Sequence, residues 1–136
     1  MAELLDGKAI AAALRARVAA RVADFVARTG RRPGLDVVLA GDDAASQVYV
    51  RNKARACEEA GMRGAVHRLP ATVTQQELLA RVGELGARDD VDGVLVQLPL
   101  PKHIDEQAVL SANSVEKDVD GFHPLNMGRL SMKVGG

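Results

Sequence analysis

The feature of this 136-residue sequence that most constrains its fold is an alternation of short strand-like runs with longer helix-like segments. Predominantly apolar runs occupy residues 35–40 and 94–98, and a third strand-like run occupies residues 64–69. Short apolar runs bounded by glycine or proline are typical of parallel strands that helices cover on both faces. The alternation therefore predicts a three-layer α/β/α domain with a mostly parallel sheet and helices on both faces.

The segments between these runs carry helix signals. Residues 6–29 have apolar side chains at helical spacing and end at a glycine, which predicts a long amphipathic helix. Residues 44–60 follow two aspartates that are candidate N-caps, and a capping box opens a further helix over residues 74–88. Residues 105–112 predict a short last helix. The side chains that carry these signals are Ile10, Leu14, Val18, Val22, Phe25, Val26, Gly30, Asp42, Asp43, Thr74 and Glu77.

Two segments fall where a ligand is expected. Ligands of doubly wound sheets bind at the carboxyl ends of the strands, and residues 41–53 and 97–101 each follow an apolar run. Pro99 and Pro101 cannot donate hydrogen bonds to a sheet, so the chain must leave the sheet there. The sequence therefore predicts a binding site to which both segments contribute.

Ser46, Tyr49 and Lys53 stand at i, i+3 and i+7 of the second predicted helix, so a hydroxyl, a phenol and an amine share one helix face. A lone lysine on a helix is more often a solvated surface charge than a catalytic group. Lysine acts in general acid–base catalysis when burial or a neighbouring cation makes its neutral form accessible, and a half-buried cleft offers such surroundings. The spacing alone leaves both interpretations open.

Gln97 and the loop at residues 117–124 are polar features with open interpretations. Gln97 ends an apolar strand, where an unpaired amide costs about 1 to 3 kcal/mol. It therefore faces a ligand or Lys53, or else it bonds to a nearby backbone group. The loop, KDVDGFHP, has the composition of a binding loop and equally of a polar turn. A carboxylate in it could bind a flat amino-substituted heterocycle, or cap a helix, or pair with a surface cation.

Composition argues against several classes of partner. Basic and acidic residues balance at 18 each and only one tyrosine and two phenylalanines occur, so no nucleic-acid partner is expected. No apolar run approaches the roughly 20 residues that span a bilayer, so no membrane partner is expected either. The three histidines are scattered and Cys57 stands alone, which predicts no metal site and favours a reducing, cytoplasmic compartment.

Three segments, taken together, resemble the methylenetetrahydrofolate dehydrogenase/cyclohydrolase family. Residues 38–53 (VLAGDDAASQVYVRNK) are similar to the first signature of that family. Residues 92–101 (DGVLVQLPLP) and 116–126 (EKDVDGFHPLN) look like its folate-site segments. The resemblance covers nearly the whole chain, from the first predicted helix to about residue 130, with the segments in the family's order.

The resemblance implies an activity and a set of residue roles. Members of this family oxidise 5,10-methylenetetrahydrofolate with NADP and hydrolyse the 5,10-methenyl product to 10-formyltetrahydrofolate in one cleft. Lys53 would manage protons and activate water, Gln97 would hold its amine, and Tyr49 would pack on the aromatic part of the folate. Asp120 would bind the pterin ring. The substrate-binding residues that the resemblance implies are Ser46, Tyr49, Val50, Lys53, Val96, Gln97, Leu98, Pro99 and Asp120.

The resemblance also implies what this chain lacks. Family members carry a second, Rossmann-type domain that binds NADP, so residues 1–136 would correspond to the tetrahydrofolate-binding catalytic domain alone. No cofactor-binding residue is expected here, because residues 41–46 contain one glycine where a dinucleotide fingerprint needs three. Homodimers are the habit of the family. The alternative interpretation is a non-catalytic folate-binding or dimerisation module.

Overall fold

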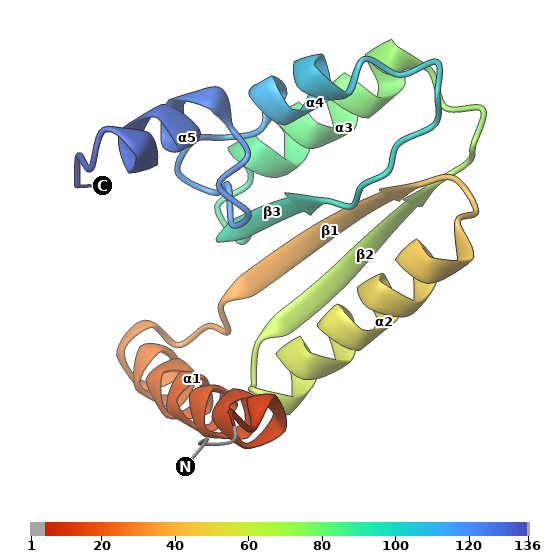
Figure 1. Cartoon of the computed structure of the whole chain (residues 1–136). Helices are drawn as coiled ribbons and strands as arrows, with labels where there is room; N and C mark the ends of the chain where they lie inside the picture. Colours follow the sequence, from red (N-terminus) through yellow and green to blue (C-terminus); the bar gives the residue numbers. More distant parts are fainter. Residues whose placement is uncertain (1–4, 136) are drawn as a thin grey trace.

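The structure of the chain is a computed structural model that describes residues 5–135, and its centre is a three-stranded parallel sheet (Figure 1). The strands β1 (Gly34–Ala40), β2 (Arg63–Leu69) and β3 (Gly93–Val96) lie in the order β2-β1-β3. Parallel neighbours need crossover connections, and a helix supplies each of them. The predicted α/β domain with a parallel sheet and helices on both faces is confirmed.

Helices cover the two faces of the sheet unequally. Helix α2 (Ala44–Glu59) packs against β1 and β2 on one face, while α3 (Gln75–Ala87) and α4 (Glu106–Ala112) form a layer on the other face (Figure 1). The caps follow the sequence prediction: Asp43 begins α2, and the capping box of Thr74 and Glu77 begins α3. The predicted bounds of these helices are correct to within one residue.

The side chains of β1 alternate between two hydrophobic clusters, because successive residues of a strand point to opposite faces. The cluster under α3 and α4, here called the α3-side core, is the larger. Its buried members are Val38, Ala40, Val73, Leu78, Val82, Leu85, Val91, Val94, Val96, Leu100, Ile104 and Val109. The α2-side core contains only Val37, Leu39, Val50 and Leu95 as buried members.

Helix α1 (Gly7–Thr29) lies beyond the amino ends of the strands (Figure 1). Asp6 caps its start, and Gly30 ends it in the left-handed region at φ 73°. The long helix is thus confirmed, but Val22 is its only buried residue, and Ile10 is 57% exposed. The first part of the predicted apolar stripe therefore has little cover among residues 5–135, whereas Val18, Phe25 and Val26 are half-buried. No helix in this range is long and apolar enough to cross a membrane.

Two elements differ from the sequence prediction. Strand β3 ends at Val96 rather than at residue 98, because the chain turns away from the sheet at Leu98 and Pro99, whose peptide bond is cis. Helix α5 (Pro124–Ser131) was not predicted. It begins with Pro124 in its first turn, and the His123 side chain accepts a hydrogen bond from the Leu125 N–H.

Candidate active site

The candidate site lies near the carboxyl end of β3, on the face of the sheet that α2 partly covers. Its central contact joins Lys53 of α2 to Gln97, which directly follows β3. The Lys53 Nζ donates to the Gln97 Oε1 at 2.8 Å, and both residues are half-buried. Two residues that are 44 positions apart in the sequence therefore meet at the predicted sheet edge.

Gln97 satisfies both ends of its amide. Its Oε1 accepts from Lys53, and its Nε2 donates to the backbone oxygen of Leu98 at 3.0 Å. Its own backbone N–H donates to the oxygen of Val38 at 2.9 Å, which holds the residue at the edge of the sheet. The two alternatives that the sequence left open for Gln97 therefore both occur, and the side chain is fixed on both sides.

The first turns of α2 present the other polar groups of this helix. The Asp43 carboxylate accepts from the Ser46 N–H at 2.8 Å, and this backbone hydrogen bond holds the pKa of Asp43 below its usual range. Ser46 is buried, and its Oγ donates to the Leu98 oxygen at 3.4 Å, which ties α2 to the segment after β3. Tyr49 is one turn before Lys53 on the helix and remains 61% exposed.

The hydrophobic members of the predicted site divide between the two faces of the sheet. Val50 belongs to the α2-side core and is fully buried. Val96 belongs to the α3-side core, and Leu98 packs against that core. The side chains of Val96 and Leu98 thus lie on the face opposite to Lys53, so a ligand beside Lys53 reaches their backbone atoms more easily than their side chains. Pro99 is exposed.

Asp120 lies in the loop between α4 and α5 and interacts electrostatically with Lys53. Partial desolvation raises the pKa of the Asp120 carboxyl above its usual value, the Lys53 charge lowers it, and the Asp118 charge raises it further. A cation and a carboxylate from separate elements therefore act on one region of space. Such a pair can bind a polar heterocycle at the carboxylate and move a proton at the amine.

Other reactive side chains lie outside this site. Cys57 is buried, and desolvation raises the pKa of its thiol, which makes it a poor nucleophile. Asp36 is fully buried in β1 and pairs with Arg63 at 2.6 Å and with His67 at 2.7 Å, both on β2. These contacts link neighbouring strands. Among residues 5–135, no group of three or more His, Cys, Asp or Glu side chains is placed to hold a metal ion.

Comparison with known proteins decides which family has this geometry. Residues 5–120 match the family model described as tetrahydrofolate dehydrogenase/cyclohydrolase, catalytic domain. The chain belongs to this family. The resemblance predicted from the three sequence segments is therefore confirmed for most of the chain.

Relatives within the family match nearly all of this chain. Bifunctional protein FolD 3 of Rhizorhabdus wittichii is 60% identical over 135 residues, which are 99% of this chain and 44% of the relative. Bifunctional protein FolD of Nitratidesulfovibrio vulgaris is 57% identical over 98% of this chain and 46% of the relative. This chain thus spans less than half the length of the curated relatives that it matches.

Solved structures of the family have the same fold. The bifunctional FolD methylenetetrahydrofolate dehydrogenase/cyclohydrolase of Campylobacter jejuni superposes with a TM-score of 0.94 at 44% identity, over 98% of this chain and 47% of that one. The Trypanosoma brucei enzyme, solved with NADP and an inhibitor, gives a TM-score of 0.93 at 40% identity, over 99% of this chain and 46% of that one. The α/β/α arrangement is therefore a property of the family.

Sequence reasoning missed the residues that hold the Asp120 loop in place. Asp118 and Asn126 bond to each other across that loop, at 3.0 Å between the carboxylate and the amide Nδ2. Asp118 lies in a loop and Asn126 lies in α5, so no single helix or strand period relates them. The one available signal was Pro124 after a possible cap, which predicts a helix start and so a sharp turn of the chain before it.

Proposed function

We propose that this chain is the folate-binding and catalytic part of an enzyme that interconverts one-carbon derivatives of tetrahydrofolate. The proposed reactions are the NADP-dependent oxidation of 5,10-methylenetetrahydrofolate and the hydrolysis of 5,10-methenyltetrahydrofolate to 10-formyltetrahydrofolate. Family membership supports this proposal. The observation that carries it is the 2.8 Å contact between Lys53 Nζ and Gln97 Oε1, because it fixes a proton-carrying group at the expected edge of the sheet.

Hydrolysis of the methenyl group needs a controlled water and a proton carrier. In the proposed step the water oxygen adds to the methenyl carbon, and the Lys53 amine takes the proton that the water loses. The carbon–N5 bond then breaks and N5 receives the proton from the Lys53 ammonium. The hydroxyl group on the carbon becomes the formyl C=O and releases its own proton to solvent, so the formyl group remains on N10 and one proton is released overall. Gln97 Oε1 accepts one N–H of the amine, which leaves the nitrogen lone pair free for this transfer.

Tyr49 and Asp120 have binding roles in this proposal. The exposed ring of Tyr49 lies on the same helix face as Lys53 and offers a flat surface for the aminobenzoyl part of the folate. The Asp120 carboxylate accepts hydrogen bonds from the amino and ring N–H groups of the pterin. A carboxylate binds such a pair of donors only when it is ionised, so folate binding should weaken as the pH falls through the raised pKa of Asp120.

The turn after β1 lacks the features of a dinucleotide-binding loop. The turn from β1 into α2 carries a single glycine, Gly41, followed by Asp42 and Asp43, whose carboxylates would repel a pyrophosphate at the start of the helix. This turn is therefore not proposed as a site for the NADP of the oxidation. A homodimer, the habit of the family, is part of the same proposal.

Replacement of Lys53 tests the proposal directly. The purified chain is mixed with 5,10-methenyltetrahydrofolate, binding is measured by calorimetry and hydrolysis by the loss of methenyl absorbance. Lys53→Ala should lower the hydrolysis rate by roughly 10² to 10⁴, the usual contribution of a general acid–base. Lys8→Ala, which removes an exposed amine from the distant helix α1, is the matched control and should leave the rate unchanged.

The outcomes separate two functions. An unchanged rate in Lys53→Ala would remove the lysine from the mechanism. Binding of folate without any hydrolysis by the unaltered chain would favour the second candidate, a non-catalytic folate-binding or dimerisation module. That candidate draws on one observation, the exposure of Tyr49 beside the site.

A further inference from the structure

The loop that carries Asp120 is attached to the edge of the sheet at its beginning. The Val94 N–H donates to the Lys117 oxygen at 2.7 Å, and Val94 forms a parallel bridge with Asp118. The Lys117 Nζ donates to the Arg88 oxygen at 2.7 Å, beyond the end of α3. The segment before Asp120 is therefore held to neighbouring elements by both the backbone and the side chain of Lys117.

A close approach between Gly93 and Val119 keeps this attachment tight. A Cβ atom added at position 93 would lie 2.6 Å from the Val119 Cγ1 and 3.3 Å from a methyl group of Leu35. A contact of 2.6 Å does not occur between non-bonded carbon atoms, so a side chain at position 93 would push Val119 away from β3. The loop residue immediately before Asp120 is thus pressed against the backbone of the strand.

Asp118 closes the other end of the loop. One carboxylate oxygen of Asp118 accepts from the His123 N–H at 2.9 Å and from the Asn126 Nδ2 at 3.0 Å. The same Nδ2 also donates to the Val115 oxygen at 2.8 Å. Asn126 therefore connects helix α5 to Val115 and to Asp118, two residues near the start of the loop. Both contacts of the carboxylate are charge-assisted, which makes them stronger than hydrogen bonds between neutral groups.

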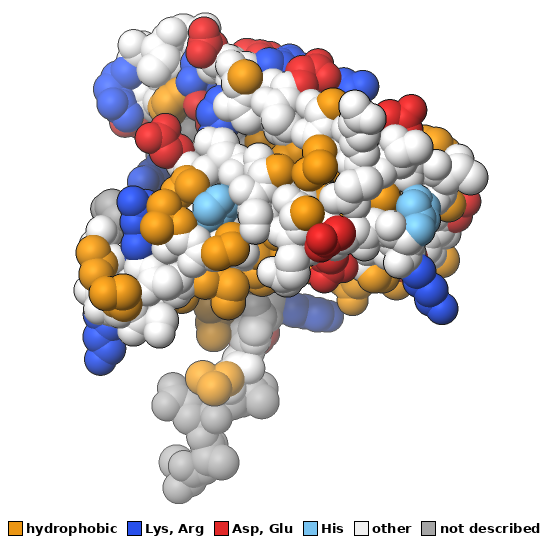
Figure 2. All heavy atoms as spheres, turned by 90° about the horizontal axis from the view of Figure 1, so that it is seen from above, with side chains coloured by type: hydrophobic (Ala, Val, Ile, Leu, Met, Phe, Trp, Pro, Cys, Tyr) orange, Lys and Arg blue, Asp and Glu red, His pale blue; other side chains and the backbone are white. Residues whose placement is uncertain are grey.

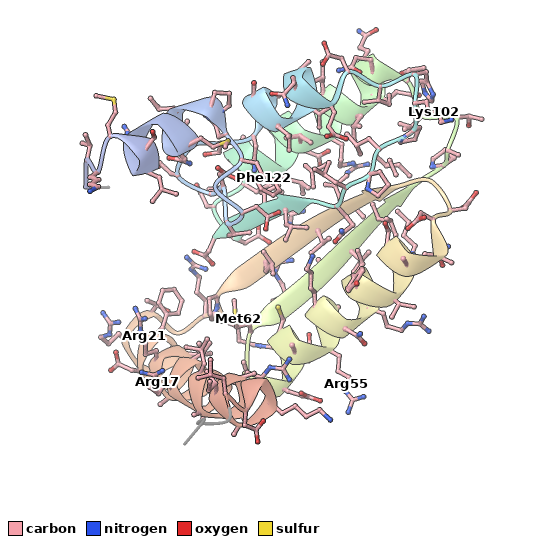
Figure 3. The ribbon with its side chains drawn as sticks, in the orientation of Figure 1. Arg17, Arg21, Arg55, Met62, Lys102 and Phe122 are labelled. Atoms are coloured by element: carbon pink, nitrogen blue, oxygen red, sulfur yellow. The ribbon has the colours of Figure 1, made fainter. Side chains whose placement is uncertain are left out.

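The segment between these contacts is short. Only residues 119–122 lie between Asp118 and His123, and Asp120 stands near the tip of this segment, followed by Gly121 at φ 71°. Phe122 lies in the same loop, which connects α4 to α5 (Figure 3). Because both ends of the segment are fixed by one carboxylate, the position of the Asp120 backbone depends on Asp118 and its donors.

We infer that Asp118 and Asn126 form a polar clasp that positions Asp120 for folate, and that Asn126 is a positioning residue of the site. This inference rests on the proposed function, in which Asp120 binds the pterin. The clasp bonds to the loop and to α5 and does not touch the reacting carbon. Loss of the clasp should therefore weaken binding of folate and leave hydrolysis at saturating folate nearly unchanged.

Amide hydrogen exchange tests the clasp without any folate. In Asn126→Ala the amide of His123 should exchange about tenfold faster than in the unaltered chain, because the carboxylate that accepts from it is held less firmly. Gln75→Ala is the matched control. It removes a side chain that also makes two hydrogen bonds to the chain, with the N–H and oxygen of Asp105, at the start of α4. It should leave the His123 amide unchanged.

Titration with 5,10-methenyltetrahydrofolate then tests positioning. Asn126→Ala should raise the KM about tenfold with a rate at saturation within about twofold of the original, and Gln75→Ala should change neither. Asp118→Asn removes a negative charge beside Asp120, so the fall of folate binding in acid should move to lower pH in this variant. Asn126→Ala keeps that charge and should not move it.

The two proposals fail in different ways. Unchanged exchange at the His123 amide and an unchanged KM in Asn126→Ala would overturn the clasp. Faster exchange with an unchanged KM would also overturn it as a positioning device, since the loop would then be loosened without effect on folate. If the unaltered chain binds no folate, the proposed function fails, whereas the exchange comparison still decides whether the clasp holds the loop.

Discussion

The two faces of the sheet differ in how much apolar surface they bury and in the kind of side chain they carry. Twelve residues form the α3-side core, whereas four form the α2-side core. The contact between Lys53 and Gln97 lies on the less covered face. An amine and an amide can remain near solvent and near a ligand there, at little cost in buried polar groups. The domain thus places most of its stabilising burial on one face and its proposed chemistry on the other.

Apolar side chains are also distributed unevenly over the outer surface of the layer that covers the α3 side of the sheet. Figure 2 shows apolar side chains gathered at its left, over α5. The exposed apolar residues of this helix are Leu125, Met127 and Leu130. No residue of α5 is buried, so the helix is held to the domain through the polar contacts of His123 and Asn126 rather than through a core of its own. Variants of the two cores and of the polar contacts should therefore lower the free energy of unfolding by different amounts.

The largest effect is expected in the α3-side core. Leu78 is fully buried in α3, and Leu78→Ala removes apolar contacts and leaves a cavity, which costs about 2 to 5 kcal/mol of unfolding free energy. Chemical denaturation followed by circular dichroism measures this loss. The matched control is Leu125→Ala in α5, where the side chain is 48% exposed and the loss should be small. Equal losses of unfolding free energy in the two variants would contradict the conclusion that the α3-side core supplies most of the stabilising burial.

A smaller effect on stability, with a clear effect on function, is expected in the α2-side core. Val50 is fully buried between α2 and the sheet, and Val50→Ala removes two methyl groups, worth roughly 1.5 to 2.5 kcal/mol. Because Val50 lies about one turn before Lys53 on α2, loss of its packing should also shift Lys53 and lower the hydrolysis rate per folded molecule. The same denaturation and absorbance measurements apply. A hydrolysis rate that fell in Leu78→Ala but not in Val50→Ala would contradict the placement of the proposed chemistry on the α2 side of the sheet.

The sequence predicted the fold well because local signals and tertiary packing agree in most elements. The capping box at Thr74, the glycine after α1 and the apolar run of β1 each act within a few residues, and the structure places all three as expected. The cover of α1 could not be predicted. Periodicity shows that a helix has an apolar face, but not which part of the molecule covers it, and the structure leaves Leu14 52% exposed.

The candidate site was predicted in part. The shared helix face of Tyr49 and Lys53 follows from spacing, and the contact of Lys53 with Gln97 agrees with a topology that brings strand ends together. The clasp of Asp118 and Asn126 could not be predicted, because it depends on how a loop folds back and not on a period. The roles of these residues toward folate stay predictions until the variants are measured.

The smallest effect is expected at the amino end of the sheet, away from both cores. The Asp92 carboxylate accepts two hydrogen bonds from Arg31 at 2.7 Å each and one from the Gly34 N–H at 2.8 Å. Both charged side chains are more than a third exposed, at 42% and 36%, so solvent screening should limit the loss in Asp92→Asn to under about 1 kcal/mol.

The pH dependence of this loss distinguishes an ion pair from simple packing. The Arg31 hydrogen bonds hold the pKa of Asp92 below its usual value, with further help from the Gly34 N–H. The stabilisation should be fully present above the unfolded pKa of about 3.9 and should disappear as the pH falls through the lower folded pKa. The difference in unfolding free energy between Asp92→Asn and the unaltered chain should therefore be constant from pH 7 to about pH 5 and shrink in stronger acid. A difference that persists undiminished in strong acid would mean that the charge of Asp92 does not contribute to stability. The amino end of the sheet would then be stabilised by packing, as the α3-side core is.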